Sequence, residues 1–208
     1  GFNPSPNAAV AMLGMQNVRN FICLLQVHFM FNGKYPDRDA QGKLVISASD
    51  YLKHATKTEE LAQTKNLPFS DTAFVAGLLF DILSEIGTTK FNLQKSFQEY
   101  VGEVYKHSLR SAVIGIQIAK ALKYEQALKL VFVGCLLHDI GKLALEIMYP
   151  PGSPKSYQDF RKEMEKKQYK RAVIHLLETK KYGLTHEHYS SQILFYSKIF
   201  KDIERAIL

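Results

Sequence analysis

The sequence predicts an all-α fold, and two observations support this prediction. Apolar residues recur at helical spacing along most of the 208 residues, and no stretch alternates apolar and polar residues as a half-buried strand does. Hydrophobic residues make up 46% of the chain and charged residues 23%, which is typical of a globular protein and excludes a disordered one.

The predicted elements follow one another along the chain. Helices are expected over residues 8–30 (one or two), 47–66, 71–86, 94–123, 125–146, 157–178 and 185–208 (one or two). Ser70 or Asp71 is the predicted N-cap of the helix over 71–86. A loop over 32–41, a turn over 87–90 and a Pro- and Gly-rich breaker over 149–154 separate these helices.

Charge and cysteine content narrow the class of protein. The chain has 27 Lys and Arg against 20 Asp and Glu, a net charge of +7 that favours anionic partners such as nucleotides, nucleic acid or lipid headgroups. Two cysteines, Cys23 and Cys135, lie in apolar runs, which excludes a disulfide scaffold and suits a reducing compartment. We therefore expect a cytoplasmic protein.

Neither a membrane span nor a complete chain is expected. No apolar run approaches the roughly 18–20 residues that a transmembrane helix needs. The sequence stops at Leu208 within a helical pattern, without a cap or a breaker, so we expect it to be a fragment of a longer protein.

Part of the sequence repeats. Residues 73–83 match residues 131–141 at an offset of 58, and residues 51–54 match residues 104–107 at an offset of 53. The first copy has Phe80 where the second has His138. Two copies of one helical unit, of which the first is degenerate, explain the match, and two unrelated apolar helices of similar type remain the alternative.

The most specific feature is the run Leu-Leu-His-Asp-Ile-Gly-Lys over residues 136–142. His138 and Asp139 follow a strongly apolar helix, where burial of two polar side chains is costly unless something pairs them. A metal ion would pair them through an imidazole nitrogen and a carboxylate oxygen. Gly141 permits close approach of another backbone, and Lys142 is suited to contact a phosphate.

Two further histidines complete the predicted site. His107 lies 31 residues before His138 on the preceding predicted helix, and His186 lies on a later one. Three histidines and Asp139 from three helices predict a metal site in the core of a helical bundle. The alternative is that each of these residues is structural. Five further residues are not expected to belong to the site, because of their positions in the sequence: His28, His54, Asp81, His175 and His188.

His107 with residues 138–142 resembles the HD superfamily of metal-dependent phosphohydrolases. Residues 151–160, with Pro151-Gly152, are similar to the stretch that follows the His-Asp motif in HD-GYP cyclic-di-GMP phosphodiesterases. In that family His186 matches the next metal-ligand histidine, and Ser190 stands where glycine is usual. Residues 11–20 and 178–186 instead resemble an HDOD domain.

This resemblance implies an organisation and a chemistry. Residues 1–90 are expected to form an HDOD-like region with a degenerate HD-like unit, and residues 91–208 an HD-type hydrolase core. The implied metal ligands are His107, His138, Asp139 and His186. Asp139 and Lys142 are the implied catalytic residues. The implied cofactors are two divalent ions, iron or manganese, although nitrogen-plus-carboxylate ligation also admits zinc.

The function expected from the resemblance is a metal-dependent phosphodiesterase of bacterial cyclic-di-GMP signalling, with water activated by the metal. The sequence departs from HD-GYP proteins because no Gly-Tyr-Pro motif is present, and the family's later ligands would fall beyond Leu208. A non-catalytic HDOD-type module that binds signalling proteins, and an HD phosphohydrolase acting on another nucleotide, are the alternatives. Nucleic acid is not expected, because the basic run over 161–171 has few aromatic residues.

Overall fold

The computed structural model describes residues 53–90 and 95–197, so the helices predicted over 8–30 and the loop over 32–41 lie outside the described residues. Every regular element in the two described stretches is helical, which confirms the all-α prediction. In chain order the elements are α4 (Lys53–Thr64), α5 (Ser70–Glu85), η1 (Ile86–Lys90), α6 (Lys95–Ala121), η2 (Glu125–Ala127), α7 (Leu128–Leu137), α8 (Ile140–Met148), α9 (Tyr157–Lys167), α10 (Arg171–Tyr182) and α11 (His186–Ser197).

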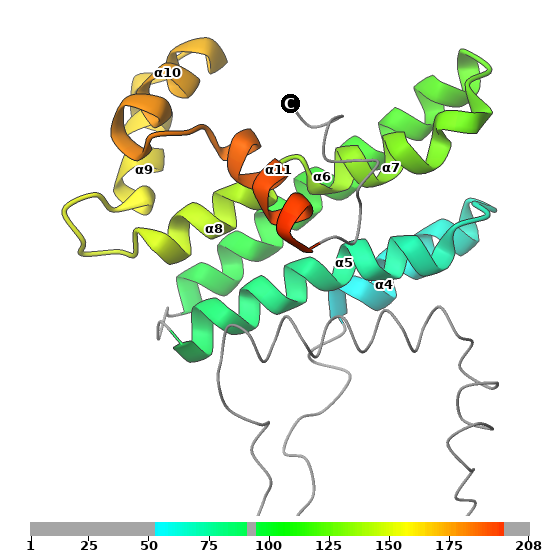
Figure 1. The fold of residues 1–208 in the computed structure, drawn as a ribbon, viewed down its shortest axis with the longest axis horizontal. Helices are drawn as coiled ribbons and strands as arrows, with labels where there is room; N and C mark the ends of the chain where they lie inside the picture. Colours follow the sequence, from blue (N-terminus) through cyan, green and yellow to red (C-terminus); the bar gives the residue numbers. More distant parts are fainter. Residues whose placement is uncertain (1–52, 91–94, 198–208) are drawn as a thin grey trace, which may run out of the picture.

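These helices pack as two hairpins with later helices added (Figure 1). The first hairpin is α4 with α5, the second is α6 with α7, and α5 contacts both helices of the second hairpin. Helix α11 lies against α8, while α9 and α10 form a separate group at one end of the molecule. The two hairpins contain the stretches that match each other in the sequence, residues 53–54 and 73–83 in the first and residues 104–107 and 131–137 in the second.

Packing rather than a cap determines where α5 begins. The prediction that Ser70 or Asp71 is the N-cap is wrong, because Phe69 occupies that position and no side chain caps the helix. Phe69 is buried and its ring lies 5.7 Å from the ring of Phe132 on α7. Burial of an aromatic side chain stabilises more than one capping hydrogen bond, so the helix starts next to the buried ring.

Helix α5 continues into a π-helical turn. The turn predicted over 87–90 is the short element η1 instead. A Cβ atom on Gly87 would collide with the ring of Phe97, so glycine lets the first residues of α6 fold back onto the end of α5. Glycine is therefore needed at position 87 to make room for the Phe97 ring, and not to form a turn.

The helix predicted over 125–146 is broken in the middle. After a short 3₁₀ turn, α7 ends before His138, and Asp139 leaves the helical conformation with φ −102° and ψ 2° before α8 begins. Ser190 on α11 forms hydrogen bonds with two backbone groups at this break. Its hydroxyl donates to the carbonyl of His138 at 2.7 Å, and it accepts from the amide of Gly141 at 2.8 Å. A tertiary contact therefore stabilises the bend.

The charged helix predicted over 157–178 is also two helices. Gln168 adopts a left-handed conformation with φ 50° and ends α9, and α10 then folds back. The reason is a second hydrophobic cluster that both helices share with α8; its buried members are Leu145, Tyr157, Phe160, Met164 and Tyr182. A straight helix would leave Tyr182 outside this cluster.

The predicted helix over 185–208 is described as α11 up to residue 197. The breaker over 149–154 is irregular, as predicted, and joins α8 to α9. The main hydrophobic cluster runs from Ala62 on α4 to Leu194 on α11 and includes residues of both proposed domains; the boundary between 1–90 and 91–208 stays a prediction. None of the described helices is long and apolar enough to cross a membrane.

Gly141→Ala tests the contact between α8 and α11. The added methyl group would collide with the backbone carbonyl of His186 and lie 2.7 Å from the amide nitrogen of Ser190, so the helices must separate. We expect the free energy of unfolding in urea to fall by about 1–3 kcal/mol. Gly134→Ala is the matched control, because its Cβ meets nothing within 4 Å. It should be neutral or stabilising by up to about 1 kcal/mol, and equal losses in both variants would contradict the packing argument.

Candidate metal centre

Asp139 lies at the centre of the site, at the bend between α7 and α8. Asp139 is only 2% exposed, and four side chains surround its carboxylate. Lys142 Nζ lies 2.7 Å away, His186 Nε2 3.3 Å, His138 Nε2 3.4 Å and His107 Nε2 3.5 Å. All five residues predicted for the site are thus brought together around one carboxylate.

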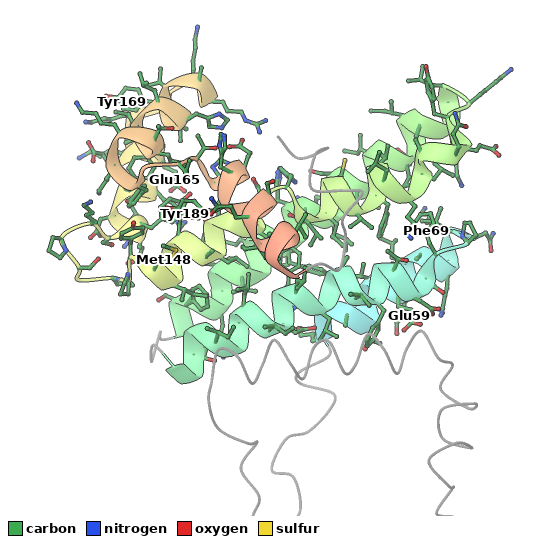
Figure 2. The ribbon with its side chains drawn as sticks, viewed as in Figure 1. Glu59, Phe69, Met148, Glu165, Tyr169 and Tyr189 are labelled. Carbon is green, nitrogen blue, oxygen red and sulfur yellow. The ribbon has the colours of Figure 1, made fainter. Side chains whose placement is uncertain are left out.

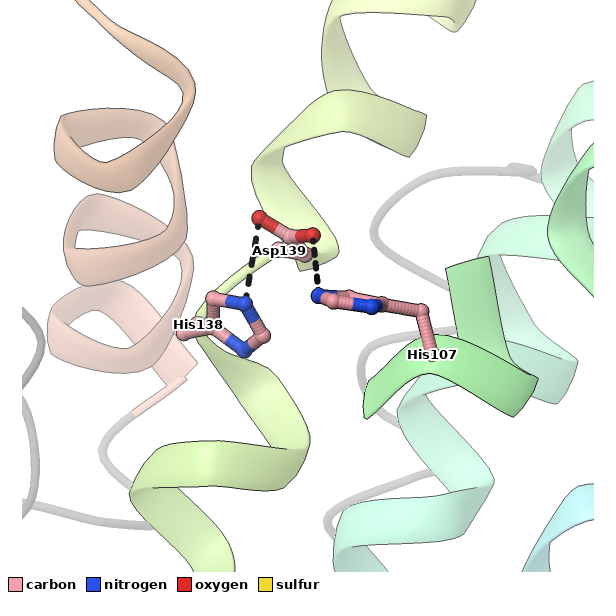
Figure 3. Close-up of side chains that lie close together, drawn as sticks. All are labelled: His107, His138 and Asp139. Carbon is pink, nitrogen blue, oxygen red and sulfur yellow. Dashed lines mark ion pairs between the residues drawn. The ribbon is translucent and has the colours of Figure 1, made fainter. Parts of the chain in front are cut away.

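Three helical segments supply these groups, namely α6, the bend between α7 and α8, and α11. Figure 3 shows His107, His138 and Asp139, which come from the first two. His107 projects from α6, the long helix before the bend, and faces Oδ2 of Asp139; His138 faces Oδ1. Donor atoms of His107, His138 and Asp139 all lie within 4.8 Å of one another, a spacing at which one metal ion could contact all three. His186 is not in this group of three. It lies on α11, with Nε2 3.3 Å from Oδ1 of the same carboxylate.

His138 is oriented as a neutral ligand would be. Its Nδ1 lies 2.8 Å from the carbonyl oxygen of Cys135, one turn earlier, so Nδ1 carries the hydrogen. Nε2 is then left with a lone pair that faces Asp139. Burial lowers the pKa of His138 and outweighs the charge of Asp139 and the hydrogen bond to Cys135, which would raise it, so the neutral form dominates at neutral pH.

Asp139 remains ionised despite its burial. Burial alone would raise the pKa of this carboxyl, but the hydrogen bond from His186 and the charge of Lys142 outweigh it and hold the pKa well below its usual range. A buried carboxylate that is always charged needs a cation beside it. Lys142 supplies that positive charge in the structure.

His186 is held by a second carboxylate. Glu178, 1% exposed, lies 2.7 Å from its Nδ1 through Oε2, and the same oxygen accepts from the His186 amide at 3.1 Å. Burial lowers the pKa of His186, but the hydrogen bonds to Asp139 and Glu178 outweigh burial and leave the pKa raised. A carboxylate behind an imidazole is a common way to orient a metal-binding histidine.

Sequence reasoning missed a second group of residues. His175, interpreted as outside the site, lies with Nε2 2.9 Å from Oε1 of Glu187, and that oxygen is 3.3 Å from Nε2 of His186. Arg171 also binds Glu187 at 2.8 Å. Burial would raise the pKa of Glu187, but Arg171 and His186 lower it to about 2. No periodicity joins α10 to α11, so only the His-Glu pair at 186–187 could have suggested this group.

His188, the other histidine of α11, is exposed and lies 2.8 Å from the hydroxyl of Thr185. It does not line the cavity at this site. Its side chain and that of His186 therefore have different environments although two positions separate them.

A cavity of about 570 Å³ opens over the site. Its lining includes the basic residues Lys142, Arg161 and Arg171, and aromatic rings including those of Tyr100 and Tyr169. The acidic residues of the lining are Glu103, Asp139, Glu165 and Glu178. The guanidinium carbon of Arg161 lies 3.3 Å from the centre of the Tyr100 ring. Tyr169 and Glu165, which also line the cavity, lie on the α9–α10 side of the molecule (Figure 2). The volume suits a small organic ligand, and the aromatic rings suit one with flat rings. The mixed charge of the lining offers cations to an anionic group and carboxylates to a metal ion.

The first copy of the repeat carries a different arrangement. Nδ1 of His54 lies 2.6 Å from Asp81, and Asp81 also accepts the backbone amides of His54 and Ala55 at 3.0–3.1 Å. Buried Phe80 replaces the middle histidine. Here the carboxylate holds the start of α4, and neither group of possible metal ligands in the described residues includes this pair.

Comparison with protein families decides the classification. The HDOD domain model matches residues 4–86 and again residues 83–194, which together cover most of the chain. This chain belongs to the HDOD domain family. Among curated proteins and among solved structures, no significant match was found. The match confirms the HDOD part of the resemblance, while the HD-GYP part and catalytic activity go beyond it.

Glu178→Gln tests how this HDOD domain holds His186. Loss of the charged acceptor should destabilise the fold by about 1–3 kcal/mol. The raised pKa means that protonated His186 stabilises the fold below pH ~6.5, and that this contribution disappears as pH rises through the folded-state value. The loss measured by urea unfolding should therefore be larger near pH ~6 than near pH ~9.

Glu165→Gln is the control for this comparison, because Glu165 is exposed on α9. It should change stability little at either pH. Imidazole NMR should also show a lower pKa for His186 in Glu178→Gln than in the unaltered chain. An unchanged pKa would contradict the role given to Glu178.

Proposed function

We propose that this HDOD domain binds a divalent metal ion through His107, His138 and Asp139 and hydrolyses a phosphodiester bond. The expected substrate, by resemblance to HD-GYP proteins, is cyclic-di-GMP. One observation carries the proposal: two imidazole nitrogens and a permanently charged carboxylate converge at a cavity that is lined by aromatic rings and by both basic and acidic side chains. HDOD domains are related to HD domains, although many are non-catalytic.

The donor set fits a divalent first-row metal ion. Donor atoms bound side by side at ~2.1 Å from one ion lie roughly 3.0–3.4 Å apart. The nitrogens of His107 and His138 lie 3.5 and 3.4 Å from the oxygens of Asp139, so small side-chain movements suffice. The resemblance suggests iron or manganese, and the same ligands also accept zinc. A bound ion of this kind acidifies water and neutralises charge on a phosphate.

The other residues of the site have roles that follow from their charge and position. Asp139 supplies fixed negative charge, and His186 holds its Oδ1 while His107 lies at its Oδ2. Lys142 neutralises Asp139 at 2.7 Å and also lines the cavity, so its ammonium group can turn to a phosphate oxygen when a metal takes its place. Arg161 and Arg171 add positive charge for an anionic ligand.

A second candidate function is a non-catalytic signalling domain that contacts other proteins. The observation that favours it is a row of exposed apolar side chains, at Ile114 and Ile118 on α6 and at Leu122 directly after it, each more than half exposed. Exposed apolar residues spaced four apart are typical of helix faces that bind a partner. Metal-dependent hydrolysis separates the two candidates.

His138→Ala and Asp139→Asn test the proposed metal centre. Each variant removes a ligand, so after dialysis against Mn²⁺ or Fe²⁺ we expect at least one metal ion fewer per chain by mass spectrometry. Hydrolysis of bis(p-nitrophenyl) phosphate and of cyclic-di-GMP should fall to background in both variants.

The control is His188→Ala, which alters an exposed histidine of α11 that does not line the cavity. Metal content and hydrolysis should both be kept. An unaltered chain that binds metal but hydrolyses neither compound would favour the signalling candidate. Hydrolysis of a different nucleotide would contradict the proposed substrate but would agree with the proposed metal site.

Lys142→Met separates binding from catalysis. The ammonium group competes with a metal for Asp139 at present, so its removal should leave metal affinity equal or higher. If Lys142 also stabilises charge on the phosphate, the hydrolysis rate should fall about a hundredfold. Loss of metal binding, measured by calorimetry, would show that Lys142 holds Asp139 in place instead.

A further inference from the structure

A second group of metal-ligand side chains lies next to the first. His175 on α10 and the adjacent residues His186 and Glu187 on α11 have donor atoms within 4.8 Å of one another. All three come from helices that the HD-type motif over 138–142 does not include. The ring centres of His175 and His186 lie 5.4 Å apart, so both rings face the same small space.

The distances match those around a small cation. Oε1 of Glu187 lies 2.9 Å from Nε2 of His175 and 3.3 Å from Nε2 of His186. Ligand atoms bound side by side to one first-row metal ion lie roughly 3.0–3.4 Å apart. Two imidazoles and one carboxylate are a donor set that iron, manganese and zinc all accept.

Glu187 gives independent support for a missing ligand. The residue is only 9% exposed, and among the described residues its Oε2 is a buried atom with no hydrogen-bond partner. A buried carboxylate oxygen without a partner costs free energy unless a cation or another donor reaches it. A metal ion bound at Oε1 could be chelated by this second oxygen.

Arg171 provides the positive charge in this structure. Its Nη2 donates to Oε1 of Glu187 at 2.8 Å, and its Nε lies 3.3 Å from Nε2 of His175. The guanidinium thus contacts two of the three donor atoms. The Arg171 side chain is 73% exposed, so it can swing into solvent at little cost when another cation arrives.

Asp139 connects the two groups. Its Oδ1 lies 3.4 Å from Nε2 of His138 and 3.3 Å from Nε2 of His186. We infer that His175, His186 and Glu187 form a second divalent-cation site, adjacent to the one at His107, His138 and Asp139 and occupied by the Arg171 guanidinium when the ion is absent. This inference rests on the proposed function and deepens it, because the first site belongs to that proposal. It assigns His186 to the second site.

The experiment counts metal ions in the 208-residue chain. After equilibrium dialysis against excess Mn²⁺, mass spectrometry should find two ions per chain in the unaltered protein. His175→Ala should retain one ion and His107→Ala should also retain one, because each removes a ligand from a different site. His188→Ala should retain two. Circular dichroism establishes that each variant is folded.

Arg171→Ala is a second test that removes no ligand. Without the competing guanidinium, the second Mn²⁺ should bind severalfold more tightly in calorimetry while the stoichiometry stays at two. Weaker binding or a loss of one ion in this variant would overturn the inference.

The remaining outcomes distinguish the two proposals. One ion per chain that disappears in His107→Ala and persists in His175→Ala overturns the second site and leaves the proposed function standing. One ion that persists in His107→Ala and disappears in His175→Ala supports the second site and contradicts the first. No bound ion in the unaltered chain overturns both.

Discussion

The contact between Ser190 and the bend at residues 138–141 determines the geometry of the site. The hydroxyl of Ser190 satisfies the carbonyl of His138 and the amide of Gly141, both released where α7 gives way to α8. Gly141 has no side chain, so the backbone of α11 comes into direct contact with α8 at this point. His186, one helical turn before Ser190, is thereby brought against Asp139.

Buried charge is the cost of this arrangement, and the structure balances it locally. Glu178 and Asp139 flank His186, while Lys142 and Arg171 neutralise Asp139 and Glu187. Each of these buried carboxylates has a basic partner, as burial of charge requires. Since Lys142 and Arg171 are partly exposed, both carboxylates can exchange a side chain for another cation without rearrangement of the helices.

Comparison of the two repeated units shows why only one has this geometry. Leu83 stands in the first unit where the second has Gly141, and α5 runs through Phe80 and Asp81 without a break. Asp81 then faces the backbone amides at the start of α4 instead of an open cavity. The same Leu-Leu-x-Asp-Ile pattern thus yields a carboxylate that binds backbone amides in the first unit and a carboxylate that lines a cavity in the second.

The sequence alone determined the all-α class, because helical periodicity is a local pattern. It also predicted Asp139 and the four residues around its carboxylate, because the His-Asp-Ile-Gly-Lys run is local and the resemblance that it carries supplied His107 and His186. It did not predict the breaks at Asp139 and Gln168, since both depend on contacts with distant residues. For the same reason it missed His175 and Glu187. Their side chains meet only because α10 folds back and α11 crosses α8, and neither event has a signature at short range along the chain.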